Sequence, residues 1–550
     1  MHPESSIPWP KRRAVLILLA LLAVIVAYSP AWPGSFVWDD DVNIVQNEHL
    51  RTADGWRRIW LSRESIEYYP LYYSSLKLQR QIFGERPVGY LIINLLLHGA
   101  SALLLRRILL RLSIPGADLA AVLFVLHPVG AHTVGWITQH KTVLSTFLYG
   151  WSVLAYLRGK RFSALGLFVA GLLTKPTMIF LPFFLFALDQ VQAPGTVARS
   201  LVRLGPWFVI AAVLGCIRLY WEPPPELVAT ADRVGSGWLR AAVAGCSLWF
   251  SAWKILVPID LMMIYPRWSI AGWTPWFLAP LFMAAGVLIL LARYRAKAPG
   301  VFLGVWFFVL AMLPVSGIFD NTFFAFSHVA NHWMYPALPG IIALVAFGLT
   351  RFPSRAIRRW MVAVIVVGYA FLTAHESRRF HDPMTYYERG IRENPDNVIA
   401  HFNLANLLVE RGRHGDALRH YQEANRIHPD FWASRLGAGK ALMAQGDYKE
   451  AFDQIAVAFA VAPDHPEIRF HLGVLFGKAG RHEEAVTHLL ASLELNPLDP
   501  AAWNNLGAAY YHLGDVEAAV RAVEQAVRLN PDYPAAHDNL ERLRKRLREE

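Results

Sequence analysis

Long apolar runs recur through the first two thirds of this chain and constrain its fold more than any other feature. A helix needs about 20 apolar residues to cross the hydrocarbon core of a bilayer. We expect crossings near residues 14–30, 88–105, 117–134, 141–157, 162–174, 176–190, 204–220, 275–292, 299–318, 333–350 and 357–374. Hydrophobic residues make up 55% and charged residues 17% of the chain, as in membrane proteins. The sequence therefore predicts an all-α, polytopic membrane domain with about 11 crossings.

Basic residues cluster between these runs and predict the orientation of the chain. The clusters are Lys11–Arg13, Arg106–Arg111, Arg158–Arg161, Arg293–Lys297 and Arg351–Arg359. With eleven crossings they all fall on one side, which the positive-inside rule assigns to the cytoplasm. The same clusters explain the net charge of +11 without nucleic acid as a partner.

This topology leaves the N-terminus in the cytoplasm and places both a first loop, 36–87, and everything after residue 375 outside. Counting the apolar segment 238–257 as a twelfth crossing would break the charge pattern, so we expect it to be re-entrant or interfacial. The chain contains no Asn-x-Ser/Thr sequon, which favours a bacterial inner membrane over the endoplasmic reticulum. The part after residue 375 would then be periplasmic.

The second domain, 376–550, is a repeat array. Five prolines follow one another at intervals of 34 residues: Pro395, Pro429, Pro463, Pro497 and Pro531. Aligned on them, small residues recur at two positions, which hold Ala405, Gly439, Gly473 and Gly507, and Ala417, Ala451, Ala485 and Ala519. This period and pattern are typical of tetratricopeptide repeats. We expect four full repeats at about 398–531 with lead-in and capping helices, forming an α-solenoid whose groove binds a protein or peptide. A spacer or oligomerisation module is the alternative.

Within the membrane domain, residues 1–375, polar side chains gather where the topology predicts the outer face. The candidates are Asp39, Asp40, Asp41, His127, His132, His140, Lys141, Lys175, Lys254, Tyr265, His328, His332 and Tyr335. Ionisable residues near a bilayer are costly and usually functional. Each has a simpler interpretation as well: aspartates in loops are often only solvated, histidines often cap helices, and lysines extend along apolar surfaces to water.

The combination of these groups suits sugar transfer from a lipid-linked phosphate. A carboxylate can accept the proton of a hydroxyl nucleophile, and Lys and His side chains can hold a phosphate leaving group. Long apolar grooves between helices would hold the lipid. No metal site is predicted, because the sequence offers no firm metal motif; dependence on a divalent ion stays open, and no other cofactor is expected.

Six motifs, in this order and followed by the repeats, resemble a known family. They are FVWDDDVNIVQN, PLYYSSLKLQRQIFG running into GYLIINLLLHG, LFVLHPVGAHTVGWITQHKTVLS, TKPTMIFLPFFLFALD, KILVPIDLMMIYP and NHWMYPALPG. The chain resembles the transmembrane and tetratricopeptide-repeat protein O-mannosyltransferases and their bacterial relatives, which join a GT-C-type glycosyltransferase domain to repeats. The resemblance implies a polyprenyl-phosphate-linked sugar as donor and a protein Ser or Thr hydroxyl as acceptor.

The resemblance also assigns roles to residues. It implies that Asp39 and Asp40 are catalytic, whereas Asp41 falls on a variable position. Lys141, Lys175, Lys254 and Tyr335 match the family, and we expect these residues, together with His332, to bind the donor phosphate. Relatives usually carry acidic residues where this chain has Gln79 and His132, and acidic–arginine pairs at Gln139–His140 and Asn331–His332.

Two other functions remain open at this stage. The departures from the family pattern allow a catalytically silent, membrane-anchored scaffold that presents its repeats to envelope proteins. Another polyprenyl-linked enzyme, such as an oligosaccharide ligase, is the second alternative. That class places its key basic residues in a large late external loop, whereas the longest external loop here is the first one and begins with acidic residues.

Overall fold

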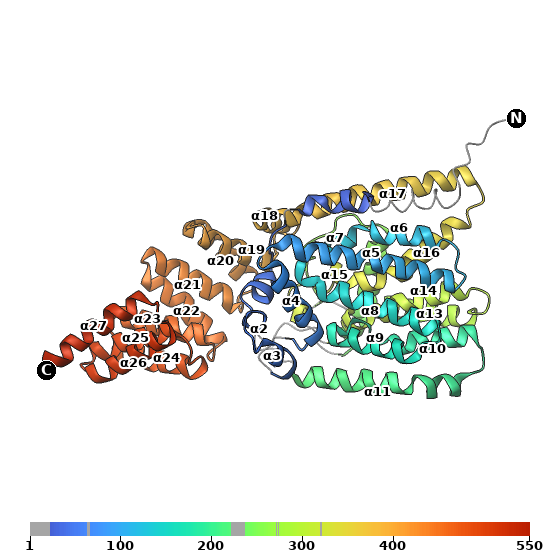
Figure 1. The fold of residues 1–550 in the computed structure, drawn as a ribbon. Coiled ribbons are helices and arrows are strands. Elements are labelled where there is room, and N and C mark those ends of the chain that lie inside the picture. Colours follow the sequence, from blue (N-terminus) through green and yellow to red (C-terminus); the bar gives the residue numbers. More distant parts are fainter. Residues whose placement is uncertain are drawn as a thin grey trace. The chain divides into compact units, whose positions relative to one another are not determined.

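The computed structural model describes residues 22–32, 34–62, 67–221, 237–270, 272, 274–319 and 322–549 (Figure 1). Helices and their connecting loops account for all of these ranges, and no strand occurs in them. The expected all-α class is therefore confirmed. The described residues form two compact units, one ending at Pro395 and the other beginning at Asp396. The basic cluster Lys11–Arg13 and the first part of the 14–30 run lie outside the described residues.

In the first unit, a helix occupies each predicted run that the structure describes. After the short apolar helix Leu22–Ala31 and the helices of loop one, they are α5 (Pro87–Arg111), α6 (Ala117–Val125), α7 (Pro128–Val134), α8 (His140–Leu157), α9 (Arg161–Thr174), α10 (Leu181–Gln192), α11 (Val197–Trp221), α12 (Gly237–Leu256), α13 (Ala279–Arg293), α14 (Pro299–Met312), α15 (Asn331–Met334), α16 (Leu338–Thr350), α17 (Arg355–Ser377) and α18 (Pro383–Glu393). Helix α5 packs against α6 and α8 and lies beside them in Figure 1.

The expected number of about 11 crossings is not confirmed. Among the residues that the structure describes, five helices are long and apolar enough to cross a membrane: Pro87–Arg111, Val197–Arg218, Pro275–Arg293, Asn331–Thr350 and Arg355–His381. A sixth follows if α6 and α7, which meet at 55°, count as one broken span. Helices α9, α10 and α14 have only 14, 12 and 14 residues. Prolines explain several of these breaks, because proline lacks the N–H that would continue a helix.

Loop one is folded rather than extended. It contains a π-helical turn, Asp41–Val45, and the helices α2 (Glu48–Arg51), α3 (Gly55–Leu61) and α4 (Pro70–Phe83). Ile44, Leu50 and Tyr72 belong to a small core of its own. The buried ammonium of Lys77 donates to the carbonyl oxygens of His49 and Thr52, at 3.0 and 2.7 Å, and so satisfies the end of α2.

The second unit consists of helix hairpins in the tetratricopeptide pattern. The pairs are α19 (Val398–Glu410) and α20 (His414–Ile427), α21 (Trp432–Gln445) and α22 (Tyr448–Val461), α23 (Pro466–Lys478) and α24 (His482–Leu495), α25 (Pro500–His512) and α26 (Val516–Leu529), followed by α27 (Pro534–Glu549). A glycine with positive φ ends the first helix of each pair, at 412, 446, 480 and 514. The small residues that recur from repeat to repeat have a steric cause: a Cβ on Gly439 would lie 2.4 Å from Ile455 Cγ1.

Candidate functional site

The acidic pair of loop one lies against the turn between α7 and α8. The carboxylate of Asp39 accepts hydrogen bonds from Trp136 Nε1 at 2.9 Å and from Thr138 Oγ1 at 2.7 Å. Asp40 is fully buried, and its two oxygens accept from the backbone amides of Thr138 and Val37 at 2.8 and 3.0 Å. Asp39 is only half-buried and Asp41 is exposed. Asp40 therefore anchors the loop, whereas Asp39 keeps part of its surface accessible.

The backbone at Trp38 turns the pair towards this site. Trp38 has a positive φ of 56°, which is strained for a residue with a bulky side chain. Two contacts hold it: its amide donates to the Tyr387 hydroxyl at 2.8 Å, and its ring stacks on Trp136 at 4.8 Å. His332 lies edge-on to the other ring of this stack, 5.3 Å from Trp136. Residues far apart in the sequence thus fix the direction of Asp39.

Two lysines lie on the same side of the unit as Asp39. Lys141, at the start of α8, forms an ion pair with Glu67 at 2.8 Å, and its charge also acts on Asp39. Lys175, which follows α9, donates from its ammonium to Thr142 Oγ1 at 2.8 Å. His332 lies within electrostatic range of both lysines. The structure therefore brings together the predicted residues Asp39, Asp40, Lys141, Lys175 and His332.

The surroundings of Asp39 and Asp40 affect the pKa values of the two carboxyl groups differently. Burial, and then the adjacent charge of Asp39, raises the pKa of Asp40 well above its usual value. Burial also raises the pKa of Asp39, but Lys141 and the bond from Thr138 oppose that shift. Of the two, Asp39 is thus the carboxylate more readily ionised and better suited to accept a proton. Burial, with Lys141 nearby, lowers the pKa of Lys175.

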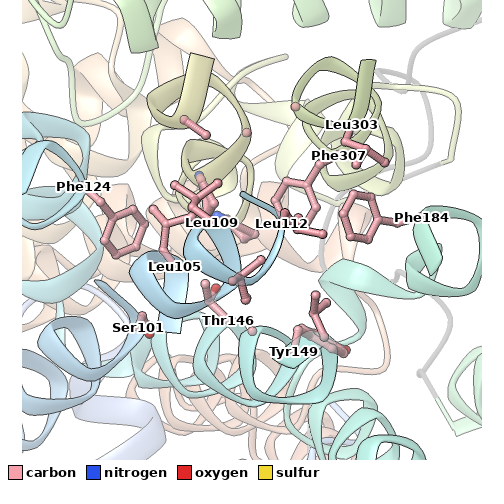
Figure 2. Close-up of a pocket in the computed structure, with 18 of the residues that line it drawn as sticks. Ser101, Leu105, Leu109, Leu112, Phe124, Thr146, Tyr149, Phe184, Leu303 and Phe307 are labelled. Atoms are coloured by element: carbon pink, nitrogen blue, oxygen red, sulfur yellow. The ribbon is translucent and has the colours of Figure 1, made fainter. Parts of the chain in front are cut away.

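An apolar groove opens between α5, α8, α10, α14 and α16. It encloses about 820 Å³, including the space open to its surroundings. In Figure 2, Thr146 and Tyr149 of α8 line one side, and Leu303 and Phe307 of α14 line the opposite side. One hydrogen bond connects this lining to Lys175 directly, since Tyr149 Oη donates to the Lys175 carbonyl at 2.9 Å. A second connection runs through Thr142, whose carbonyl accepts from Thr146 Oγ1 at 2.8 Å and whose Oγ1 accepts from the Lys175 ammonium. The groove therefore lies next to the lysine cluster.

His140 is part of a neutral, buried cluster. Its Nδ1 lies 2.8 Å from Asn94 Oδ1, and its Nε2 lies 2.8 Å from Ser75 Oγ and 3.2 Å from Gln79 Nε2. Because Asn94 Oδ1 can only accept, Nδ1 carries the proton and Nε2 accepts. His140 thus pairs with Gln79, and both are positions where the resemblance implies charged residues in relatives.

His132 and His127 connect helices instead of facing the lysines. His132 Nε2 lies 2.9 Å from Glu376 Oε2 at the end of α17. Glu376 is also bound by Arg389 at 2.8 Å and by the fully buried Arg379. His127 begins α7 and its Nε2 lies 2.9 Å from the carbonyl of Ile255 on α12. Both histidines therefore have positioning contacts.

Lys254 and Tyr335 do not join the cluster in the structure. The Lys254 ammonium donates to the carbonyls of Ile259 and Asp260, at 2.8 and 3.1 Å, and so satisfies the loop that follows α12. The Tyr335 hydroxyl is buried in the helical core, 2.8 Å from His98 Nδ1. Two other candidates also serve local structure: Tyr265 Oη donates to Asn331 Oδ1 at 2.8 Å, and His328 Nδ1 accepts from the Trp268 amide at 3.2 Å.

Sequence reasoning missed several members of the cluster. Glu67, Trp136, Thr138 and Thr142 contact the predicted residues directly, and the charge of Arg218 on α11 acts on Glu67, Lys141 and Lys175. Arg218 had a detectable signal, because it is an arginine near the end of an apolar run. Among the residues that the structure describes, no three His, Cys, Asp or Glu side chains are arranged to hold a metal ion.

Comparisons with known proteins agree with the motif resemblance. The chain is 24% identical over 494 residues to the protein O-mannosyl-transferase TMTC4 of Homo sapiens, an alignment that covers 74% of this chain and 65% of that protein. It is 23% identical over 464 residues to human protein O-mannosyl-transferase TMTC1, covering 71% and 52%, and 22% identical over 434 residues to protein O-mannosyl-transferase F38B6.6 of Caenorhabditis elegans, covering 73% and 60%. The chain thus spans less than two thirds of the length of these relatives.

The repeat region matches known repeats as well. Profiles of the tetratricopeptide repeat match residues 376–430 and 472–534, and residues 408–469. A solved structure titled MamA 41-end, from Desulfovibrio magneticus RS-1, is 26% identical and covers 27% of this chain and 84% of its own, with a TM-score of 0.26. The relatives and the repeat profiles together confirm the expected similarity to protein O-mannosyltransferases and the expected tetratricopeptide repeats.

Proposed function

We propose that the chain is a membrane glycosyltransferase that moves a sugar from a polyprenyl-phosphate-linked donor to a Ser or Thr hydroxyl of a protein. The observation that carries this proposal is the half-buried Asp39, held by Trp136 and Thr138 and within electrostatic range of Lys141. A base and a cation at one site are what a displacement at a glycosyl phosphate requires. The names of the relatives support the same reaction class.

In the proposed reaction, Asp39 accepts the proton of the acceptor hydroxyl, and the oxygen of that hydroxyl attacks the anomeric carbon of the donor sugar. The bond between that carbon and the phosphate oxygen breaks, and the electron pair leaves with the lipid phosphate. Lys141 and Lys175 offset the charge that develops on that phosphate, with His332 beside them. Asp40 positions Asp39 through its two backbone hydrogen bonds.

The apolar groove is the proposed binding site of the isoprenoid chain of the donor. It lies beside Lys175 through the contacts of Thr146 and Tyr149, so a lipid in the groove would bring its phosphate to the cations. Such a lipid needs no polar partner along its chain, which fits a lining of mainly Leu, Phe and Gly. The proposed acceptor is recruited by the repeats, whose stacked helices offer an extended concave surface to proteins.

We further propose a bacterial inner-membrane topology with loop one and the repeats on the periplasmic side. The basic clusters support this orientation, because the positive-inside rule places them on the cytoplasmic side. A reporter fused after residue 400 tests it: activity of an alkaline phosphatase fusion is expected, and a fusion active only as a cytoplasmic reporter would refute the topology.

The catalytic proposal is tested with purified full-length protein. We expect polyprenyl phosphates among its co-purified lipids by native mass spectrometry, and transfer of a labelled sugar from polyprenyl phosphate to a Ser/Thr-containing peptide. Asp39→Asn should lower the transfer rate at least about 100-fold, whereas Asp41→Asn, at the exposed neighbour, should leave it unchanged. Full activity of Asp39→Asn would exclude Asp39 as the base. Absence of both lipid phosphate and transfer would favour the scaffold alternative.

A further inference from the structure

We infer that the hydroxyl of Tyr72 is a ligand of the donor phosphate, a role that rests on the proposed function. Tyr72 lies on α4 and is fully buried, yet its hydroxyl has no hydrogen-bond partner among the residues that the structure describes. Two neighbouring tyrosines of the same core differ in this respect. The Tyr73 hydroxyl donates to Asn43 Oδ1 at 3.0 Å, and the Tyr90 hydroxyl donates to the Gly84 carbonyl at 2.7 Å.

An unpartnered buried hydroxyl is costly, because the group has lost its bonds to water and gained nothing in return. Buried polar groups in proteins are nearly always hydrogen-bonded, so an exception calls for a cause. Tyr72 keeps its hydroxyl although phenylalanine would fill the same space at no such cost. A ligand that supplies an acceptor provides that cause.

The surroundings place Tyr72 within the candidate site. The ammonium of Lys141 lies 5.8 Å from the centre of the Tyr72 ring and 5.7 Å from that of Tyr69. The charges of Asp39, Asp40 and Glu67 also act on the Tyr72 hydroxyl. Tyr72 is thus next to the lysine that we assign to the phosphate and in range of the proposed base.

The acceptors nearby are already engaged by other donors. Asp39 accepts from Trp136, Thr138 and Asn43. Both oxygens of Asp40 accept from backbone amides. Glu67 accepts from Lys141 through Oε2. These three carboxylates thus already have donors, and none of them bonds to the Tyr72 hydroxyl among the residues that the structure describes.

Phosphate is the ligand chemistry that fits this hydroxyl best. Burial, followed by the neighbouring Tyr73 and the carboxylates, raises the pKa of Tyr72 well above its usual value, so the phenol keeps its proton and acts as a donor. Ionised phosphate oxygens accept such bonds strongly, more so than neutral oxygens. Lys141, Lys175 and Arg218 supply the positive charge that a phosphate needs in this place.

The test uses full-length protein with farnesyl phosphate as the probe and farnesol as its uncharged counterpart. Wild-type protein should bind farnesyl phosphate more tightly than farnesol. Tyr72→Phe should weaken binding of farnesyl phosphate on the order of 10-fold and leave farnesol binding unchanged. Without ligand, its thermal midpoint should equal or exceed that of the wild type, because a costly buried hydroxyl has been removed.

Tyr90→Phe is the matched control, since Tyr90 is equally buried in the same core but its hydroxyl is partnered. This variant should lower the thermal midpoint and leave farnesyl phosphate binding unchanged. Equal binding by Tyr72→Phe and the wild type would overturn the inference while leaving the proposed transfer activity intact. A wild type that does not distinguish farnesyl phosphate from farnesol would overturn it too. Tyr72-dependent phosphate binding without any sugar transfer would support the inference and refute the proposed function.

Discussion

The ammonium of Lys175 donates a hydrogen bond to Thr142 Oγ1 across 2.8 Å and so joins the end of α9 to the first turn of α8. Thr142 lies one turn before Thr146, which lines the apolar groove. The most apolar and the most polar parts of the first unit therefore meet at this bond. Lys175 thus bonds, through its carbonyl and its ammonium, to two residues of α8, Tyr149 and Thr142.

We predict a bell-shaped pH dependence of kcat/KM with two assignable limbs. Asp39 must be ionised to act as a base, and burial raises its pKa, so activity should be lost as pH falls through a value above that of an ordinary aspartate. Lys175 must be charged to hold phosphate, and burial lowers its pKa, so activity should be lost as pH rises, earlier than for an ordinary lysine.

Lys175→Arg separates these limbs, because arginine stays charged throughout the accessible pH range. The variant should move the alkaline limb upward and leave the acidic limb in place. Thr142→Val, which removes the partner of Lys175 but no charge, is the control and should retain both limbs. An alkaline limb that is identical in Lys175→Arg and the wild type would exclude Lys175 as its origin.

Gln79 and His140 should behave as a coupled pair. Gln79→Glu or His140→Arg alone would leave a buried charge without its partner and should lower the free energy of unfolding by about 3–5 kcal/mol. The double variant restores an acidic–basic pair at the same contact and should recover at least half of that loss. Thermal or denaturant unfolding of all four proteins measures the coupling. Strictly additive losses would show that the two side chains do not interact.

The buried ion network at the end of α17 should contribute strongly to stability. Glu376→Gln removes a charge that His132, Arg379 and Arg389 share and should cost about 3 kcal/mol. Glu388→Gln removes one member of the exposed pair with Arg392 on α18 and should leave the thermal midpoint nearly unchanged. Comparable shifts in the two variants would mean that the buried network is not stabilising.

Two glycines of α23 should respond in opposite directions to alanine. A Cβ on Gly473 would lie 2.6 Å from Leu489 Cγ, so Gly473→Ala should destabilise the repeats by about 1–3 kcal/mol through overpacking. A Cβ on Gly477 has its nearest neighbour at 3.9 Å, so Gly477→Ala should stabilise the helix by about 0.5–1 kcal/mol. Circular dichroism at 222 nm during heating reports both, and a loss in the second variant would contradict the packing argument.

The repeats and most helices could be predicted from the sequence because their signals are local and periodic. A 34-residue period needs no knowledge of distant contacts, and Gly439 and Gly473 occupy it for a reason that the structure makes visible. The number of crossings could not be predicted in the same way. An apolar run of 12–14 residues has the same sequence pattern whether its helix spans a membrane or ends at a proline inside the helical bundle.

The site was predictable only in part, because it depends on side chains brought together by folding. Asp39, Lys141 and Lys175 lie in recognisable motifs and come together. Glu67 carried no local signal, since its role appears only when loop one folds over α8. Lys254 and Tyr335 stand in equally recognisable motifs, yet their polar atoms bond to a local loop and to His98. Motif position alone does not report where a side chain points.

The strained backbone at Trp38 has a consequence for the speed of any reaction at Asp39. Because Trp136 and Tyr387 already hold Trp38 in its left-handed conformation, the ordering entropy of this segment is lost once, during folding. The carboxylate of Asp39 then already has its orientation before a substrate binds. The segment around Trp38 is in this respect a preformed template, and the binding of a ligand at Asp39 would not have to include the entropy of ordering it.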